Sequence, residues 1–566
     1  MDHHLIEPVS DQVASESQEY EFTDAHLAGK LVEERLEGEF LWALGLGWMH
    51  WTGKRWERTD QPEPTEAARQ WVIGHWEEAR RQAYGAAQSK AARVQLLQEL
   101  RNWQGWTSSG RVRALVEFAK GLLHRSYKDF DAFPDLLNCN NGIVSLRTGD
   151  LLPHDPAKML TKLAPVDYRP EATHADWDAA LSALPADIRG WYRVRLGQGV
   201  TGHMTPDDVL LVQQGQGANG KSTIMGAVQA TLVDYFLVVS PRALNADASA
   251  HTTELASFRG ARLASLEELP EERQLSVVRL KTLCGTPVLT ARFIAQDDMS
   301  FDATHTLVIN TNYAPAVTET DDGTWRRLVL VHFPYRYVRH EDELRGERDR
   351  IGDQGLRDRL RRGQAQREAV LAWLVRGAME WYARDRIMPP LPERVTADTE
   401  AWRETSDLVL AYVKENLRFD PASHVLSTEL QRDFNMWLIA QSHRPWNSKT
   451  FVSRFSGHQM FRNNAVEKRF TRRTDGLSRR PADPGYPVPP LPNAYTAWFG
   501  VGFAENDFQG SPPVLDVLAS SADWQSSPPI EPTGSAYTSN TPPLCEGCGE
   551  RHERYGADGR PCRKLP

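Results

Sequence analysis

The sequence predicts an α/β fold whose core is a mainly parallel sheet. Two observations lead to this prediction. Between about residues 196 and 335, short apolar runs alternate with helix-compatible stretches, which is the pattern of parallel strands joined by crossover helices. One of these runs passes directly into a glycine-rich loop, and a helix-compatible stretch follows. The candidate strands are residues 209–213, 262–266, 306–309 and 328–333.

The chain is long enough for several domains, and composition changes mark their boundaries. For 566 residues, roughly two to four domains are expected. Helices are predicted near residues 25–41 and 67–103, and hairpins are predicted to turn at Gly53 and at 148–150. The predicted divisions are a disordered N-terminus (1–21), a mostly helical domain (22–195), the core (196–340), a charged helical region (341–406), a small module (407–480), a disordered linker (481–542) and a cysteine-containing tail (543–566).

Composition narrows the class of protein. A hydrophobic content of 40% and a charged content of 25% are typical of a globular protein, and no run of eighteen apolar residues predicts a membrane span. The N-terminus has no apolar core of a signal peptide, and five cysteines exclude a disulfide scaffold, so a reducing cytoplasm is expected. A net charge of −9 argues against a nucleic-acid coat protein but allows a localised basic channel.

The glycine-rich loop reads GQGANGKS from Gly215 to Ser222 and fills the frame G-x-x-x-x-G-K-[ST]. Glycines let the backbone N–H groups point at phosphate oxygens, and the following helix adds its positive end. Lys221 is predicted to reach the outer phosphates, and the Ser222 hydroxyl is predicted to ligate Mg²⁺. The loop therefore predicts a nucleoside triphosphate site for ATP, formed by Gly215, Gln216, Gly217, Ala218, Asn219, Gly220, Lys221, Ser222 and Thr223.

Polar residues follow the next two candidate strands, where ligands lie in open α/β sheets. Glu267 and Glu268 end the 262–266 strand and are predicted to support the metal and to polarise water; an exposed acidic pair is the alternative. The 306–309 strand leads into amides, and a neutral amide can position water beside a phosphate. Asn310, Tyr313 and Pro315 fit a simple turn equally well.

Two arginines precede the last candidate strand. Arg326 or Arg327 is predicted to neutralise charge that develops in phosphoryl transfer, across a subunit boundary. A surface ion pair with Asp321 or Asp322 is the alternative.

These motifs in order resemble superfamily 3 helicases, specifically the phage/plasmid and poxvirus-type primase-helicase proteins. The set is GQGANGKST, LASLEE, LKTLCGTPVLTAR, LVINTNYAP and WRRLVLVHF. The stretches FPDLLNCNNGIVSLRTGDLLPHDP and GAMEWYARDRIMPPLPERVTADTEAWRETSDLV are also similar to that family, so the resemblance covers most of residues 22–480. It implies a P-loop, AAA+-like core that is preceded by a mostly helical domain and followed by a winged-helix-like module.

The resemblance also implies roles for particular residues. Lys221 and Ser222 become the triphosphate and Mg²⁺ contacts, while Glu267 and Glu268 become the metal-supporting and water-activating acids. Asn312 becomes the sensor of the γ-phosphate, and Arg327, with Arg326 as its rival, becomes the finger in a neighbour's site. Lys281 and Arg292 fall in the family's DNA-contacting stretch. Here the chain departs from the family: Gly285-Thr286-Pro287 replaces Gly-Gly-Asp, and the expected hairpin tip at 295–299 is acidic, which would repel phosphate.

The function implied by the resemblance is that of an ATP-driven replicative DNA helicase, a ring-forming motor that translocates on single-stranded DNA and unwinds duplex. Its expected partners are single-stranded and forked DNA, further copies in a homo-hexamer and a separate primase or polymerase, without a membrane. About twenty residues precede the resemblance, so no primer-synthesis site is expected. The expected location is the cytoplasm, which is the host's if the protein is phage-encoded.

Two other classes of protein remain open. The first is an ATP-regulated replication initiator or loader that binds DNA without processive unwinding. The second is a DNA-packaging ATPase, which predicts an acidic nuclease cluster, and the sequence after residue 340 contains none.

Two C-terminal features suggest further ligands. Residues 444–480 carry ten Lys or Arg and two acidic residues, with aromatic residues between them. This composition predicts a nucleic-acid contact through Lys468, Arg469, Arg472 and Arg473, and a solvated basic face is the alternative. The tail contains four residues that could bind one Zn²⁺ ion, namely Cys545, Cys548, His552 and Cys562. The alternative is an unstructured tail with reduced cysteines. Cys139 and Cys284 are expected in the core.

Overall fold

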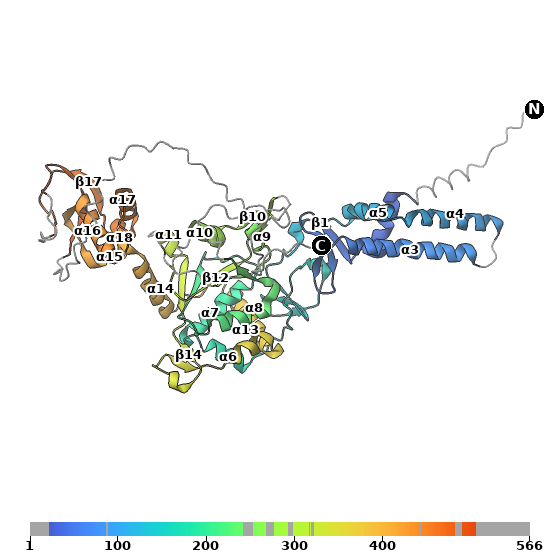
Figure 1. Ribbon diagram of the computed structural model, residues 1–566, viewed down its shortest axis with the longest axis horizontal. Helices are drawn as coiled ribbons and strands as arrows, with labels where there is room; N and C mark the ends of the chain where they lie inside the picture. The colour runs from blue at the N-terminus through green and yellow to red at the C-terminus, as the bar shows by residue number, and fades with distance from the viewer. Residues whose placement is uncertain are drawn as a thin grey trace, which may run out of the picture. The chain divides into compact units, whose positions relative to one another are not determined.

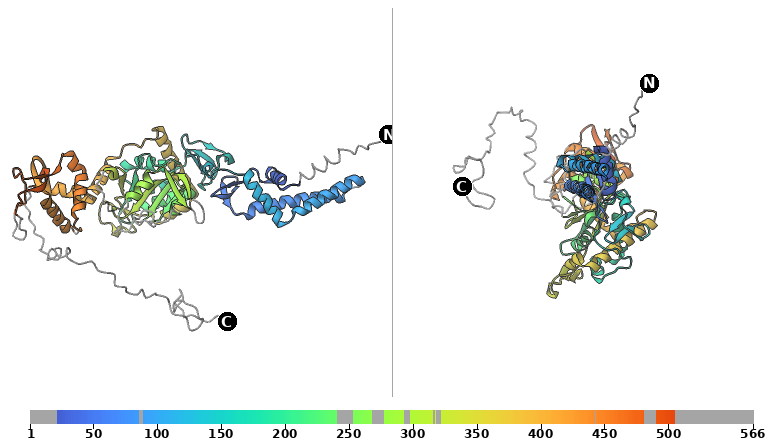
Figure 2. Two further views of the ribbon diagram at one scale, coloured as in Figure 1. Left: turned by 90° about the horizontal axis from the view of Figure 1, so that it is seen from above. Right: turned by 90° about the vertical axis from the view of Figure 1, so that its right-hand side faces the viewer.

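The computed structural model shows a mixed α/β protein with a parallel sheet (Figures 1 and 2). It describes residues 22–85, 89–240, 253–267, 277–292, 298–315, 317, 322–441, 443–480 and 490–504. The predicted disordered N-terminus, Glu268, most of the predicted linker and the whole cysteine-containing tail lie outside these residues. Within them, no helix is both long enough and apolar enough to cross a membrane.

The region before the core combines helices with two small antiparallel sheets. The hairpin predicted at Gly53 is confirmed, and Gly53 has a φ of +85° that favours glycine. The predicted helix at 25–41 ends early, because the chain turns extended at Glu37 and Gly38 has a φ of +78°. The predicted helix at 67–103 is two helices that run side by side. The elements are α2 (Asp24–Leu31), a π-helical turn (Val32–Leu36), β1 (Phe40–Ala43), β2 (Gly47–Trp51), β3 (Trp56–Thr59), α3 (Pro62–Tyr84), α4 (Lys90–Trp106) and α5 (Ser109–Leu122).

The second small sheet follows α5 and contains the other predicted hairpin. Its strands β5 and β6 pair antiparallel, and Gly149 in the connecting turn has a φ of +79°. Two helices then lead to the core. The elements are β4 (Leu136–Cys139), β5 (Gly142–Ser145), β6 (Leu151–Leu152), α6 (Ala175–Leu181) and α7 (Ala186–Gly199), with 3-10 turns at Tyr127–Asp129 and Pro156–Lys158.

The core is a five-stranded parallel sheet with the strand order β13-β7-β12-β9-β8. All four predicted strands are present, and an edge strand, β8, was not predicted. The central strands are apolar runs because both of their faces are buried. The bounds are β7 (Leu210–Gln214), α8 (Lys221–Leu232), a 3-10 turn (Val233–Tyr235), β8 (Phe236–Val239), α9 (Thr253–Ala256), β9 (Leu263–Glu267), α10 (Val277–Gly285), β10 (Val288–Arg292), β11 (Asp298–Asp302), β12 (Thr306–Thr311), α11 (Asp322–Trp325) and β13 (Leu328–His332).

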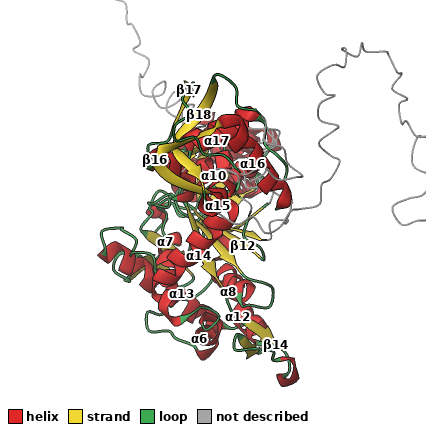
Figure 3. Cartoon of the chain, turned by 90° about the vertical axis from the view of Figure 1, so that its left-hand side faces the viewer, coloured by secondary structure: helices red, strands yellow, loops and turns green. Residues whose placement is uncertain are grey.

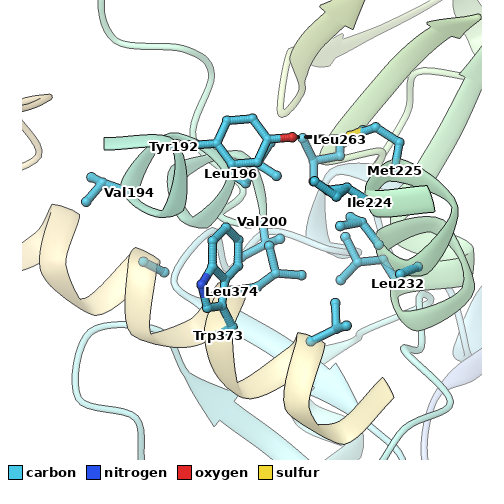
Figure 4. Packing of buried hydrophobic residues seen from close by; sticks show 14 of the residues in the cluster. Tyr192, Val194, Leu196, Val200, Ile224, Met225, Leu232, Leu263, Trp373 and Leu374 are labelled. Atoms are coloured by element: carbon cyan, nitrogen blue, oxygen red, sulfur yellow. Dashed lines mark hydrogen bonds between the residues drawn. The ribbon is translucent and has the colours of Figure 1, made fainter. Parts of the chain in front are cut away.

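Helices cover both faces of this sheet. One apolar cluster joins alternate strand residues to side chains of α7, α8 and α13, as Figure 4 shows for Tyr192, Met225 and Trp373. The intervening strand residues enter a second cluster with α10 and α14. Helices α7 and α13 touch through glycine, since a Cβ on Gly197 would lie 2.2 Å from the carbonyl carbon of Gly377. The elements after the core are β14 (Arg336–Val338), a 3-10 turn (Glu341–Glu343), β15 (Asp349–Ile351), α12 (Leu356–Arg362), α13 (Gln364–Ala383) and α14 (Glu393–Ser406).

The C-terminal module is a three-stranded antiparallel sheet packed with helices (Figure 3). Its strand order is β16-β18-β17, so the last strand lies in the middle. This strand falls inside the predicted linker, and the predicted module boundary at residue 480 is therefore wrong. The bounds are α15 (Leu408–Asn416), β16 (Leu417–Leu426), α16 (Ser427–Ala440), α17 (Ser448–Gly457), α18 (Gln459–Asn463), β17 (Glu467–Thr471) and β18 (Tyr495–Phe503).

Candidate nucleotide site at the carboxyl edge of the sheet

The glycine-rich loop joins the carboxyl end of β7 to the N-terminus of α8. Its crest turns through positive φ at Gly217 (+45°), Ala218 (+46°) and Gly220 (+91°). At its base, the Gly215 N–H donates to the Thr311 carbonyl at 3.2 Å. A Cβ on Gly215 would lie 2.9 Å from the Phe333 carbonyl oxygen, so only glycine fits there. The loop crest is exposed, whereas its base is fixed between two strand ends.

Lys221 is the first residue of α8, and its side chain folds back over the loop. The residue is 5% exposed, and its ammonium donates to the Gly215 carbonyl and to Asn219 Oδ1, the latter at 3.2 Å. Ser222 is exposed at the start of the helix, and Thr223 is half-buried behind it. The sequence therefore places a buried cation, an exposed hydroxyl and a helix N-terminus around one exposed loop.

An acid and an amide face each other at the ends of β9 and β12. Asn310 is the register partner of Glu267, and its Nδ2 donates to Glu267 Oε1 at 2.8 Å and to Ser265 Oγ at 3.0 Å. The Ser265 hydroxyl also donates to Glu267 Oε1 at 3.0 Å. The Glu267 residue is exposed, but its carboxylate is oriented by both partners.

At Asn310 the structure excludes the alternative interpretation of the sequence. Asn310 was weighed as a turn residue, but it lies within β12 and is 3% exposed. Its Oδ1 is buried and has no hydrogen-bond partner among the described residues, and the same holds for Asn219 Nδ2. Both atoms belong to residues at this edge of the sheet, so an acceptor and a donor remain available there. In the sequence, the only sign of a functional role for Asn310 was that a polar residue follows directly on an apolar strand.

Of the two other residues predicted at this edge, the structure describes Asn312 but not Glu268. Asn312 lies two residues beyond Asn310, half-buried in the bend that follows β12. Glu268 lies outside the described residues, so the structure gives no position for the second acid. Because the five strands are parallel, the loop, Glu267 and Asn312 all follow strand ends on one edge of the sheet.

The sequence interpretation missed His332, which ends β13 on the same edge. His332 is the register partner of Gln214, the last residue of β7. Burial lowers the pKa of His332; Asp398 of α14 opposes this effect, and Arg348, Lys221 and Arg394 add to it. Its imidazole is therefore neutral at pH 7. Burial likewise raises the pKa of Asp398. Nothing in the sequence around His332 distinguishes it from an ordinary strand residue.

Arg327 lies at the opposite edge of the sheet. Its carbonyl accepts from the Leu210 N–H at 2.6 Å, where β7 begins rather than where the phosphate loop begins. Its guanidinium donates to Asp208 Oδ2 at 2.9 Å and to the Gly323 carbonyl at 2.5 Å. An ion pair was the stated alternative for this arginine, but its partner is Asp208 rather than Asp321 or Asp322. Arg326 is exposed.

The two predicted DNA contacts of the core lie on α10 and β10. Lys281 is exposed on α10, and Arg292 ends β10, where it pairs with Asp298 of β11. The antiparallel β10–β11 ladder confirms the expected hairpin. Residues 293–297, which include most of its acidic tip, lie outside the described residues.

The basic strip of the C-terminal module divides into two groups. Arg479 donates to Glu429 at 2.8 Å, Arg480 donates to Asp433 at 3.1 Å, and Arg454 lies over Trp446. These three cations therefore stabilise the module itself. The exposed cations are Arg444, Lys449, Arg462, Lys468, Arg469, Arg472 and Arg473, which include all four predicted DNA contacts.

The cysteine predictions have different outcomes. Cys139 and Cys284 are buried, as predicted, and burial raises the pKa of the Cys284 thiol to about 12. The predicted zinc ligands Cys545, Cys548, His552 and Cys562 lie outside the described residues. Within the part of the chain that the structure describes, no group of three or more His, Cys, Asp or Glu residues is placed to hold a metal ion.

Comparison with known proteins finds a family model and several viral relatives that match parts of the chain. Residues 29–183 match the family model described as D5 N terminal like. A protein of African swine fever virus that is named as a primase, C962R, is 23% identical over 381 residues, which is 62% of this chain and 38% of the relative. The chain is therefore similar to viral primase-helicase proteins, and it spans well under two thirds of the length of the curated relatives that it matches.

Two other relatives and one solved structure also match parts of the chain. A mimivirus protein named as a helicase, L207/L206 of Acanthamoeba polyphaga mimivirus, is 25% identical over 37% of this chain and 22% of its own length. A Frog virus 3 protein named as a helicase, 022R, is 24% identical over 42% of this chain and 25% of its own length. The NrS-1 C terminal region is 13% identical, with 49% of this chain and 58% of that chain covered, at a TM-score of 0.33. The fold assignment therefore depends on this chain's own sheet.

Proposed function

We propose that this protein is an ATP-driven replicative DNA helicase of superfamily 3 with an AAA+-like P-loop core. One observation carries the proposal. The glycine-rich loop with its buried Lys221 and the oriented carboxylate of Glu267 follow strand ends on the same edge of one parallel sheet. Phosphoryl transfer needs a phosphate-binding loop and an acid within one site. In this fold, two segments that are distant in the sequence provide them at the same edge of the sheet.

The loop residues fit a nucleoside triphosphate with Mg²⁺. No atom would contact a Cβ built on Gly217, so the exposed crest has room for a phosphate beside the backbone N–H groups. The Lys221 ammonium already lies against the loop and would exchange a carbonyl for a phosphate oxygen. Ser222 and Glu267 are the residues that would hold Mg²⁺. The bound ion would neutralise charge on the phosphates.

Glu267 and its neighbours would handle the attacking water. Its carboxylate is an acceptor held by Asn310 and Ser265, which fixes its orientation toward a water. Glu268, the next residue, remains the second acid, and the two divide the metal-supporting and water-activating roles. Asn312 would report the γ-phosphate from the bend after β12. The unpartnered Oδ1 of Asn310 can accept from a bound water at the same place.

The position of the arginines supports the proposed ring. Arg326 and Arg327 precede β13 at the amino edge of the sheet, while the loop lies at the carboxyl edge. Neither arginine therefore serves the loop of its own chain. Either one would complete the site of a neighbouring copy, which supports a homo-hexamer with sites at subunit boundaries. A separate primase or polymerase would use the unwound strands.

Strand displacement on forked DNA with Lys221→Ala beside the wild type tests this function. The variant is expected to lose ATP hydrolysis and unwinding while DNA binding persists, because the loop binds phosphates of the nucleotide and not of DNA. Lys90→Ala, on the exposed start of α4, is the matched control and should unwind normally. Unwinding by Lys221→Ala at the wild-type rate would remove the loop from the mechanism.

The C-terminal module favours a second candidate, an ATP-regulated initiator or loader. Its order of helix, strand, three helices and two strands resembles that of a winged helix, a kind of helix-turn-helix domain that reads duplex DNA. A loader would hydrolyse ATP on duplex DNA without displacing a strand. The same forked substrate therefore separates the two functions.

A further inference from the structure

Strand β17 carries an exposed aromatic ring among cations. Phe470 is 68% exposed, although its backbone is fixed opposite Thr496 in the ladder with β18. Its neighbours on the strand are also exposed, and β17 is an edge strand of its sheet. This large apolar ring belongs to neither of the apolar clusters that pack the module, so packing within the module does not account for it.

The charges around Phe470 define the chemistry of its partner. Lys468 shares the face of Phe470, because alternate residues of a strand point the same way. Arg472 and Arg473 follow the strand and are exposed. Among the described residues, none of these three cations forms an ion pair with a carboxylate. The partner is therefore anionic and offers flat apolar groups, a combination found in nucleic acid.

Arg469 differs from the other predicted contacts. It points to the opposite face, where its guanidinium lies 4.0 Å from the ring centre of Phe499 and 4.0 Å from Glu467. Arg469 therefore contacts an aromatic ring and a carboxylate, whereas Lys468 lies 5.7 Å from the ring centre of Trp498 and pairs with no carboxylate among the described residues. All four cations were predicted to have the same role, and the structure places three of them on the face or at the end of the strand that carries Phe470.

The segment beyond β17 is held in place. The carbonyl of Arg473 accepts from His424 Nε2 at 3.1 Å and from the Tyr495 hydroxyl. The Gly476 carbonyl accepts from the His424 N–H, and the Ser478 N–H donates to the His424 carbonyl, each at 2.8 Å. The ring and the cations are therefore presented by a rigid surface, which reduces the entropy lost on binding.

We propose that β17 is a single-strand DNA platform on which Phe470 stacks with a base while Lys468, Arg472 and Arg473 hold the adjoining phosphates. In a duplex both faces of each base are covered by its neighbours, so a protruding ring has nothing to stack on. In a single strand every base offers a free face. This inference rests on the proposed function only in taking DNA as the partner.

The test measures binding of the full chain, without nucleotide, to a single-stranded oligonucleotide that contains 2-aminopurine and to a duplex of the same length. Phe470→Ala should weaken single-strand binding about five- to one-hundred-fold and abolish the stacking-dependent change in 2-aminopurine fluorescence. Duplex binding should change less than about twofold. Phe470→Trp should retain binding, and Ile439→Ala, at an exposed apolar residue of α16 in the same module, is the matched control.

Several results would overturn the platform. They are an unchanged affinity of Phe470→Ala for the single strand, an equal loss for single strand and duplex, and the failure of Phe470→Trp to bind. These outcomes are separate from those for the proposed function, since ATP hydrolysis in the absence of DNA depends on Lys221 and not on Phe470. If the platform exists but the motor does not, the protein binds single strands, and Lys221→Ala changes neither this binding nor unwinding. If the motor exists but this platform does not, Phe470→Ala unwinds DNA as well as the wild type.

Discussion

The contacts of Arg327 predict which arginine would act as the finger in the proposed ring. Its guanidinium makes hydrogen bonds of 2.9 Å to Asp208 and 2.5 Å to the Gly323 carbonyl, and its side chain is 19% exposed. Hydrogen bonds to charged groups contribute about 1.5–3 kcal/mol each. To enter a neighbour's site, Arg327 would first lose both, at roughly 3–6 kcal/mol. Arg326 is exposed and faces no such loss, so we expect Arg326 to be the finger.

The two alanine variants should therefore fail in different ways. Arg326→Ala is expected to lower the rate of ATP hydrolysis by about 10³–10⁵-fold, the range seen for such arginines, with little change in stability. Arg327→Ala is expected to lower the free energy of unfolding by about 3 kcal/mol, since it leaves Asp208 without its partner. ATP turnover and urea unfolding, measured on both proteins, separate these effects.

Mixing experiments test whether the arginine acts on a neighbour. Lys221→Ala and Arg326→Ala chains are each inactive alone, but a mixed ring contains boundaries at which an intact Lys221 meets an intact Arg326. Hydrolysis should then return in part. Two results would refute the reasoning. The first is a mixture that is as inactive as its components. The second is an Arg326→Ala protein that hydrolyses ATP normally, together with an Arg327→Ala protein that folds stably but is inactive.

Two further predictions concern stability. Gly197→Ala should destabilise the protein by about 1–3 kcal/mol or more, because its Cβ would lie 2.2 Å from the backbone of Gly377; Gly190→Ala on the same helix, where nothing lies within 4 Å, should stabilise by up to about 1 kcal/mol in the same thermal melt. Burial raises the pKa of Asp135, but hydrogen bonds from Tyr382, Arg147 and His203 outweigh this and lower it to about 2, so its contribution is present above about pH 4 and is lost as pH falls toward 2. Asp135→Asn should therefore cost about 1–2 kcal/mol at pH 7, and a difference from wild type that persists at pH 2 would contradict this assignment.

The predicted strands were found because a parallel sheet leaves an unusually clear pattern. Strands buried on both faces are continuous apolar runs, and the loop after β7 is a local motif, so neither required long-range information. The edge strand β8 was missed, since it is short and only its last residue is fully buried. Strand β18 was missed because proline-rich sequence precedes it and its partners, β16 and β17, lie far back in the chain.

Side-chain partners were the part that the sequence did not predict. Asn310 and Glu267 are 43 residues apart, and Arg327 and Asp208 are 119 apart, so no local pattern joins them. The residue types at the strand ends could be predicted from the sequence. That Glu267 is oriented by neighbours, that Asn310 keeps an unpartnered oxygen and that Arg327 is held in an ion pair depends on the strand order. Strand order is set by packing that single-sequence patterns do not encode.

The basic strip illustrates the same point at the level of charge. Ten cations against two acids look like one binding surface in the sequence. Folding brings Glu429 and Asp433 of α16 against Arg479 and Arg480, and these acids lie outside the strip. Seven cations remain exposed, and four of them lie on β17 or directly after it. A charge count along the chain therefore predicts a basic surface, but the proposed nucleic-acid contact can be placed only after the ion pairs that serve folding are removed.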